Sequence, residues 1–402
     1  MKNYLIILCC LFFISHVKAQ EKKLAPTPPM GWMSWNYFAD KINEKDLKEM
    51  ADALVSSGMA KVGYSHIFID DGWQGGRDNK NNMIADPLKF PSGMKALADY
   101  MHSKGLKLGI YSDAAQLTCA GYTASLGFEE QDAKTFAGWG IDYLKYDYCH
   151  APEDVETAKD RYKKMATALR NSGRDIVFGI CEWGPRQPWL WGADVGGQLW
   201  RTTYDVRDKW KNLTNNKNAL GILDILDINA TLNDYSGPGK WNDADMLVAG
   251  LYGKKGPSGD EGGFGCTDVE YQTQFSLWAM MNSPLYATND LRNMNEATKK
   301  ILLNEEVIAI NQDEIGKQAI RKINDSIWNV FVKPLSNGDF ALAILNRSNA
   351  AQKSEVNFAD LGINDKYEIR DLWQYKIIGK AKKWKGEVQS HETKMFRLKK
   401  QK

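Results

Sequence analysis

Acidic side chains follow a series of short apolar runs in this sequence, each near the point where the run ends. They are Asp70, Asp71, Asp113, Asp147, Glu182 and Asp205. A carboxyl group donates a proton when it is protonated, and it accepts a proton or attacks a carbon atom when it is ionised. A single residue of this kind is ordinarily a helix N-cap or one half of a surface ion pair. Six at equivalent positions indicate one shared site, because like charges raise each other's pKa and are costly to gather.

Hydrolysis of a glycosidic bond is the chemistry that this group of carboxylates favours. In that reaction one carboxylic acid protonates the leaving oxygen while a second carboxylate attacks the sugar. The cysteines form no Cys-x-x-Cys pair, and no histidine stands at metal-ligand spacing from them. We therefore expect neither a metal ion nor another cofactor at the site.

Aromatic residues beside the same apolar runs support a sugar as the ligand. They are Trp32, Trp35, Trp73, Tyr111, Tyr146, Trp183 and Trp241. An aromatic face packs against the C–H face of a sugar ring while polar groups bind its hydroxyls. We expect part of this set to be ordinary core residues. Lys145, beside Asp147, is either a donor to sugar hydroxyls or a structural ion-pair partner.

The elements that must position these side chains alternate regularly along the chain. Strand-like runs cover 64–70, 106–111, 141–146 and 175–180, and helical patterns cover 44–57, 91–104, 129–139 and 153–171. This alternation predicts parallel βα units, and the length favours a (β/α)8 barrel over residues 20–317. The carboxyl ends of barrel strands meet at one face, where the acidic residues would gather. An open doubly wound sheet is the alternative, but no Gly-x-Gly-x-x-Gly follows the first strand.

A different pattern begins after about Lys317. Trp328, Val330 and Val332 occupy every second position, and Asn337-Gly338 then separates them from a second run over 340–345. Asn-Gly between two such runs is a strong hairpin signal. With further strands expected over 367–373 and 394–398, residues 318–402 are predicted to form a small antiparallel β-sandwich domain.

The first 19 residues have the features of a signal peptide. Lys2 precedes an apolar stretch from Tyr4 to Ile14 that is too short to span a bilayer, and cleavage is expected near Ala19. The protein is therefore expected to be exported, either to a periplasm or out of the cell. A lipid anchor on Cys9 or Cys10 is the weaker alternative. No later stretch of the sequence is apolar enough to cross a membrane.

Charge gives no indication of a polyanionic partner. The whole chain carries a formal charge of +2, and removing a signal peptide with Lys2 and Lys18 leaves it near zero. Nucleic acid is therefore not an expected partner. Four cysteines remain after residue 19, namely Cys119, Cys149, Cys181 and Cys266. At least one disulfide is plausible in an oxidising compartment.

Six motifs, in order and suitably spaced, resemble those of the α-galactosidases, or melibiases, of glycoside hydrolase family 27. They are Gly31-Trp32-Met33-Ser34-Trp35-Asn36, Ile69-Asp70-Asp71-Gly72-Trp73, Lys145-Tyr146-Asp147-Tyr148-Cys149, Cys181-Glu182-Trp183-Gly184, Trp200-Arg201-Thr202-Thr203-Tyr204-Asp205 and Trp241-Asn242-Asp243-Ala244-Asp245-Met246. The resemblance runs from about Ala25 to Asp313 and continues more weakly into the β domain.

The resemblance implies a retaining, exo-acting hydrolysis of terminal α-linked galactose. Asp147 matches the nucleophile that forms a covalent galactosyl-enzyme, and Asp205 matches the acid/base. Such a double displacement places the two carboxyl groups about 5–5.5 Å apart. The expected partner is a galactosylated oligo- or polysaccharide, and the oligomeric state is left open.

The resemblance also implies which residues bind the sugar. Asp70 and Asp71 match acceptors from the 4- and 6-hydroxyls, Lys145 matches a donor to the 3- and 4-hydroxyls, and Glu182 and Arg201 match contacts to the 2-hydroxyl. Trp35, Tyr111 and Trp183 match aromatic walls, and Asp245 and Met246 are expected to line the same pocket. Cys119 and Cys149 match a bonded pair in the family, whereas Cys181 is expected to be a free buried thiol.

Three alternatives remain open at the level of the sequence. A β-L-arabinopyranoside is galactose without its hydroxymethyl group and is a competing substrate. Glu182 stands where relatives that accept N-acetylgalactosamine have a small residue, so that substrate is disfavoured. A catalytically idle carbohydrate-binding barrel is less consistent with the presence of both Asp147 and Asp205. The β domain could anchor the enzyme to polysaccharide, although a structural role is expected.

Overall fold

The computed structural model describes residues 24–400 except 215, 255 and 258–264. The expected signal peptide over 1–19 lies outside these described residues. Among the helices that are described, none combines the length and the apolar character that a membrane span requires.

Eight parallel strands form the centre of the described N-terminal part, in the order β10-β1-β2-β5-β6-β7-β8-β9. They are β1 (Met30–Met33), β2 (His66–Phe68), β5 (Lys107–Asp113), β6 (Tyr143–Asp147), β7 (Val177–Cys181), β8 (Leu199–Arg201), β9 (Trp241–Asp243) and β10 (Leu285–Ala287). The two edges meet because Leu247, just after β9, forms a parallel bridge with Ala287, and its backbone N–H donates to the Tyr286 carbonyl at 2.7 Å. The predicted (β/α)8 barrel is confirmed.

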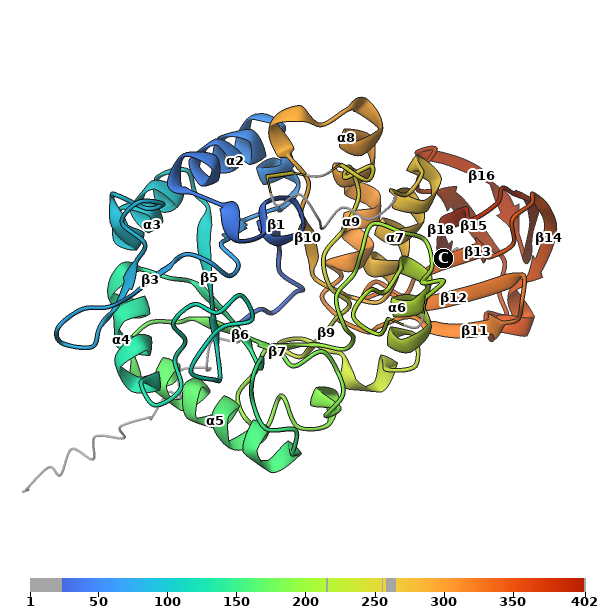
Figure 1. Ribbon diagram of the computed structural model, residues 1–402. Coiled ribbons are helices and arrows are strands. Elements are labelled where there is room, and N and C mark those ends of the chain that lie inside the picture. Colours follow the sequence, from blue (N-terminus) through green and yellow to red (C-terminus); the bar gives the residue numbers. More distant parts are fainter. Residues whose placement is uncertain (1–23, 215, 255, 258–264, 401–402) are drawn as a thin grey trace, which may run out of the picture.

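Helices surround this ring of strands (Figure 1). They are α1 (Trp35–Phe38), α2 (Glu44–Ser56), α3 (Gly93–Ser103), α4 (Glu129–Trp139), α5 (Val155–Asn171), α6 (Ile222–Asn229), α7 (Asp268–Met280), α8 (Glu296–Leu302) and α9 (Glu305–Asn311), with a hairpin of β3 (Gln74–Arg77) and β4 (Met83–Ala85) beside them. Helices α2 to α5 lie where the sequence predicts them. Helix α5 begins two residues later than predicted because Asp154 is its N-cap and accepts from the Thr157 N–H.

The ends of four strands differ from the prediction: β2 ends two residues earlier, β5 two residues later, and β6 and β7 one residue later. Strand β6 ends at Asp147 itself, and β7 ends at Cys181. Asp147 and Cys181 are register partners in adjacent parallel strands. Register partners in neighbouring strands point to the same face of a sheet, so Cys181 shares the face of Asp147. Glu182 is the first residue after the end of β7.

The C-terminal part contains a six-stranded antiparallel sheet, in the order β11-β12-β13-β18-β15-β16, and a second sheet of β14 and β17. Its strands are β11 (Ile320–Asn324), β12 (Trp328–Pro334), β13 (Phe340–Asn346), β14 (Gln352–Asn357), β15 (Tyr367–Asp371), β16 (Lys376–Ala381), β17 (Lys383–Val388) and β18 (Thr393–Lys400). The predicted hairpin is β12–β13, and Gly338 in its turn has a φ of 83°. The predicted antiparallel β domain is confirmed.

The two faces of the larger sheet serve two different cores. Val330, Val332, Leu342 and Ile344 pack inside the β domain. Their neighbours Phe331, Ala341, Ala343 and Leu345 belong to the core that is continuous with the barrel. Helix α7 lies against this second face, which explains why apolar residues occur on all sides of that helix. The β domain is therefore packed onto the barrel through a shared apolar layer.

Candidate active site

The acidic residues singled out in the sequence lie at the carboxyl ends of the barrel strands. Asp70 and Asp71 follow β2, Asp113 and Asp147 end β5 and β6, and Asp205 lies in the loop after β8. Asp113 and Asp147 are register partners. In a (β/α)8 barrel this face carries the active site, so the strands position these carboxylates together.

Asp147 is buried, with 4% of its surface exposed. Its Oδ1 accepts from the Tyr148 N–H at 3.0 Å, and its Oδ2 accepts from the Tyr111 hydroxyl at 3.1 Å. Burial raises the pKa of Asp147 to about 7; the charge of Asp205 adds to this effect, and the Lys145 ammonium opposes it. A buried carboxylate held at both oxygens is well placed for attack on a carbon atom.

Asp205 differs from Asp147 in both exposure and partners. Its side chain is 31% exposed, and its Oδ1 accepts from Arg201 Nη2 at 3.0 Å. Burial alone would raise the pKa of Asp205, but the Arg201 guanidinium holds it below the ordinary value. The two carboxylates interact and therefore titrate as a pair, which still carries one proton just below pH 7.

Arg201 joins Asp205 to a second carboxylate. Its Nη2 lies 3.0 Å from Asp245 Oδ2, and the same oxygen accepts from the Val206 N–H at 2.8 Å. Asp245 has a φ of 71°, a conformation that costs free energy in a residue other than glycine. The Nε of Arg201 is buried and has no hydrogen-bond partner among the described residues. This donor is available to a ligand.

Asp70, Asp71 and Lys145 form a second polar group at the site. Lys145 Nζ donates to Asp70 Oδ2 at 2.8 Å, and Asp71 Oδ2 accepts from the Ala120 N–H at 2.8 Å. The Asp70 charge raises the pKa of Lys145 against the effect of burial, and burial raises the pKa of Asp71 to about 6. Asp71 Oδ1 is buried without a hydrogen-bond partner in the described part of the chain. An unpaired buried acceptor is costly, which suits an oxygen that binds a ligand hydroxyl.

The aromatic residues that the sequence singles out differ in their burial. Trp32, Trp73, Tyr146 and Trp241 are fully buried. Trp35 starts α1 and is half-buried. Lys145 Nζ lies 5.3 Å from the centre of the Tyr111 ring.

Trp183 and Met246 differ in their surroundings. Trp183 is half-buried, has a φ of 60° and stacks on Tyr204 with 6.1 Å between the ring centres. Met246 is buried in the core of the barrel. The strained backbone at Trp183 is typical of a residue whose position matters for function.

The Cys119–Cys149 disulfide is present, with its Cα atoms 5.1 Å apart. It ties the loop after β5 to a residue two positions after Asp147, and the Tyr111 hydroxyl lies 3.2 Å from Cys119 Sγ. Cys181 and Cys266 are free and buried. Asp113 and Asp147 cluster with the sulfurs of Cys119 and Cys149 within metal-ligand distance. These sulfurs are bonded to each other and are not thiolates.

Glu182 forms its hydrogen bonds within its own loop. Its oxygens accept from the Gly184 N–H at 3.0 Å and from the N–H and guanidinium of Arg186 at 3.1 Å each. No part of its surface is exposed. In the described structure the Glu182 carboxylate therefore supports the loop that carries Trp183.

Two site residues were missed by the sequence reasoning. Cys181 Sγ lies 3.9 Å from Arg201 Nη1 and faces the same side as Asp147. Asp243, at the end of β9, lines a small cavity together with Lys145, Cys181 and Arg201, and burial raises its pKa to about 6. The strict alternation of side chains along β7 was a signal that could have identified Cys181.

Family models match both parts of the chain. The model described as Alpha galactosidase A matches residues 27–313, and the model described as Alpha galactosidase C-terminal beta sandwich domain matches residues 325–398.

Individual relatives give the same result over nearly the whole length. The chain is 46% identical over 377 residues to Alpha-galactosidase A of Cellvibrio japonicus, covering 92% of this chain and 88% of that protein. Alpha-galactosidase I from Mortierella vinacea has a similar crystal structure, with a TM-score of 0.87, 33% identity and coverage of 94% and 98%. A β-L-arabinopyranosidase from Geobacillus stearothermophilus is more distant, with a TM-score of 0.81, 25% identity and coverage of 94% and 97%.

Proposed function

The chain belongs to the α-galactosidase family of glycoside hydrolases, and on that premise we propose that it is a retaining, exo-acting α-galactosidase that removes terminal α-linked galactose from oligo- or polysaccharides. The observation that carries this function is the interacting pair of Asp147 and Asp205, in which one carboxylate is raised in pKa and the other is held ionised by Arg201.

Two displacements at the anomeric carbon make up the reaction. In the first, the Asp147 carboxylate attacks this carbon, the glycosidic C–O bond breaks, and Asp205 donates its proton to the departing oxygen. In the second, Asp205 takes a proton from water, the water oxygen attacks the same carbon, and the ester bond to Asp147 breaks. Two inversions retain the configuration.

The first step requires the shared proton on Asp205 and the charge on Asp147. In the free site Arg201 favours the proton on Asp147 and the charge on Asp205, because its guanidinium donates to Asp205. A 2-hydroxyl that accepts from Arg201 weakens this hold on Asp205 and raises its pKa. The Tyr111 hydroxyl and the Tyr148 N–H stabilise the charge that Asp147 then carries.

Galactose is recognised by the polar group opposite the catalytic pair. We assign Asp70 and Asp71 to the 4- and 6-hydroxyls and Lys145 to the 3- and 4-hydroxyls, with Trp35, Tyr111 and Trp183 as walls. The unpaired Asp71 Oδ1 supports this assignment, because a hydroxyl would satisfy it. A β-L-arabinopyranoside lacks the hydroxymethyl group and would leave one acceptor unpaired, so it is expected to be the poorer substrate.

Replacement of the nucleophile tests this function. Asp147→Asn keeps the size of the side chain but removes the attacking charge, so hydrolysis of p-nitrophenyl α-galactoside is expected to fall by about four orders of magnitude or more. Asp160→Asn, at an exposed position of α5, is the matched control and should retain full activity. Normal turnover by Asp147→Asn would refute the nucleophile assignment.

A second variant separates the acid/base from a merely structural residue. Asp205→Ala should accumulate the galactosyl-enzyme on a substrate whose leaving group needs no proton. Azide, a nucleophile that needs no general base, should then restore turnover and give a galactosyl azide. Parallel rates on β-L-arabinopyranoside and α-N-acetylgalactosaminide substrates identify the preferred sugar.

We also propose that the protein is exported and cleaved near Ala19, and that the barrel spans 20–317 and the β domain 318–402. The disulfide supports export, since such bonds persist in oxidising compartments. Mass spectrometry of the protein from its native host should give the mass of a chain that begins at Gln20. An intact N-terminus would contradict cleavage.

A further inference from the structure

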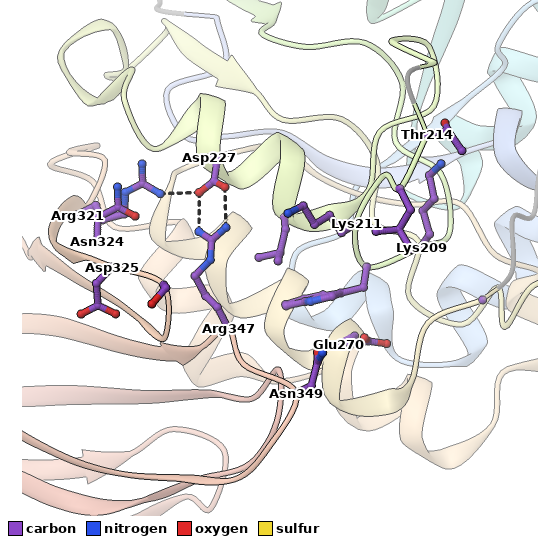
Figure 2. Close-up of a pocket in the computed structure, with 15 residues that line it drawn as sticks. Lys209, Lys211, Thr214, Asp227, Glu270, Arg321, Asn324, Asp325, Arg347 and Asn349 are labelled. Atoms are coloured by element: carbon purple, nitrogen blue, oxygen red, sulfur yellow. Dashed lines mark hydrogen bonds and ion pairs between the residues drawn. The ribbon is translucent and has the colours of Figure 1, made fainter.

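A groove of about 1160 Å³ separates the barrel from one end of the β domain. We call it the interdomain groove. One wall contains Lys209, Trp210 and Lys211 from the loop between β8 and α6. The opposite wall contains Asn324 at the end of β11, and Asp325 and Asn349 from turns of the β domain. Figure 2 shows Lys209 and Lys211 across the groove from Asn324 and Asp325.

Part of the groove's barrel wall comes from segments that follow the carboxyl ends of the strands. They are the loop that follows β8 and the start of α7, which also follows a strand of the barrel. Both segments lie at the carboxyl ends of the strands, where the catalytic residues are gathered. A long ligand can therefore reach both places without passing around the molecule.

One loop connects the groove directly to Asp205. The Asp205 carbonyl accepts from the Leu220 N–H at 3.2 Å, and the Trp210 carbonyl accepts from the Leu223 N–H at 2.9 Å. Trp210 is five residues after Asp205, so their Cα atoms lie within about 18 Å of each other. Because Asp205 protonates the leaving oxygen, the part of the substrate beyond the galactosyl group lies on the Asp205 side of the pocket.

Trp210 gives the groove an aromatic platform. Its indole is backed by the His391 ring, with 4.5 Å between the ring centres and 19° between the planes. His391 is itself fixed by Glu270, whose Oε1 lies 2.7 Å from His391 Nδ1, and by Asn349. A flat, preorganised ring of this kind suits the C–H face of a sugar.

The charges of the groove are largely paired with each other. Asp227 accepts from Arg321 at 2.7 Å and from both terminal nitrogens of Arg347 at 2.6 and 2.7 Å (Figure 2). Asp325 lies on the wall opposite Lys209 and Lys211 and offsets part of their charge. No concentration of one sign remains among the lining residues, so an anionic polymer is not favoured. Amide, hydroxyl and ammonium groups beside an indole are the groups that bind a neutral glycan.

We propose that the interdomain groove binds the neutral polysaccharide chain that carries the galactosyl group. The barrel and the β domain together hold this chain while one galactosyl side group occupies the pocket at Asp147. The proposal rests on the proposed function, because it names the polymer to which the terminal galactose is attached. It gives the β domain a direct part in substrate binding, besides its packing on α7.

Two groove variants on opposite walls test the proposal. Trp210→Ala removes the platform, and Asn349→Ala removes an amide from the β domain. Each should lower kcat/KM on galactomannan, a neutral galactosylated polymer, by about 3- to 10-fold, mainly through KM. On p-nitrophenyl α-galactoside, which is too small to reach the groove, both should stay within about twofold of the wild type. Tyr375→Ala, an exposed aromatic of the β domain outside the groove, is the control and should change neither rate.

The outcomes are distinct from those that test the function. Equal losses on both substrates would show that the variants act through the Asp205 loop and would overturn the proposal, as would no loss on galactomannan. If the wild type fails to hydrolyse p-nitrophenyl α-galactoside, the function itself is wrong. Equilibrium binding of polysaccharides to the Asp147→Asn protein, which is expected not to hydrolyse them, measures binding separately from turnover. Galactomannan should bind and polygalacturonate should not, and the reverse preference would overturn the choice of a neutral glycan.

Discussion

The carboxylates at the mouth of the barrel differ in their protonation because their neighbours differ. Asp147 is enclosed and has a pKa near 7, whereas Asp205 is partly exposed and is held ionised by Arg201. Neither residue alone defines the active form. Under the roles proposed for Asp147 and Asp205, activity belongs to the state in which the pair carries one proton, since the reaction needs one charged nucleophile and one proton donor.

This pairing predicts the pH dependence of the free enzyme. Above about pH 7 the pair loses its last proton, so no acid remains for the leaving group, and kcat/KM should fall about tenfold per pH unit. At strongly acidic pH, below the ordinary range of an Asp carboxyl, both groups are protonated and activity should fall again. Rates measured between pH 3 and 9 on a substrate with a poor leaving group check this. A profile that stays flat up to pH 9 would contradict it.

Glu182 provides a second residue-level test. Because its oxygens accept from Gly184 and Arg186, Glu182→Gln should lower the free energy of unfolding by about 1–3 kcal/mol while kcat/KM changes little. Cys181→Leu adds volume on the face of Asp147 and should instead raise KM. Thermal unfolding and kinetics of both variants separate the two roles. An unchanged Tm with a large loss of activity in Glu182→Gln would restore the direct contact with the 2-hydroxyl that the motif implies.

At the level of elements, regular periodicity made the barrel predictable. The helical stretches over 44–57, 91–104 and 129–139 became α2, α3 and α4 with shifts of no more than two residues. Each carries one apolar stripe that must face the strands, so local pattern and tertiary packing agree. The Asn337-Gly338 turn was equally clear, because few residues other than glycine adopt the backbone that it requires.

Contacts between distant loops were not predictable from the sequence. Asp208 accepts from the Gly253 N–H at 2.7 Å, the Cys266 N–H at 3.0 Å and the Tyr271 hydroxyl at 2.8 Å. It thereby ties the loop of Asp205 to the segment before α7. These partners are separated by 45 to 63 positions. Local propensity carries no information about such pairings. It also does not reveal that Arg186 donates hydrogen bonds to the Glu182 carboxylate.

At the level of the whole molecule, Lys333 links the β domain to the barrel. Its ammonium is fully buried and donates to Asn282 Oδ1 and to the carbonyls of Ile310 and Ala279. Strand β12 thus reaches the ends of α7 and α9. Burial lowers the pKa of Lys333 to about 7.

This lysine predicts how the stability of the joined domains depends on pH. An unfolded lysine binds its proton up to about pH 10.4, so between pH 7 and that value the unfolded state holds more protons than the folded state. The wild type should therefore gain stability relative to Lys333→Met as pH rises from 7 to 9.5, by about 1 kcal/mol per pH unit. Denaturant unfolding at several pH values measures this, with exposed Lys385→Met as the control. A difference that does not vary with pH would show that Lys333 remains charged.

The closure of the barrel has a consequence for how the molecule is made. Strand β1 pairs with β10, where Met30 is opposite Leu285, and one face of α7 is covered only when the β domain is in place. Neither contact can form while the ribosome is still adding the residues between them. The chain therefore emerges with apolar strands and an apolar helix that have no partners yet, and folding is delayed until synthesis is nearly complete. Chaperone dependence and aggregation of truncated chains are thus built into the topology, and a chain that stops at residue 317 should accumulate as insoluble protein.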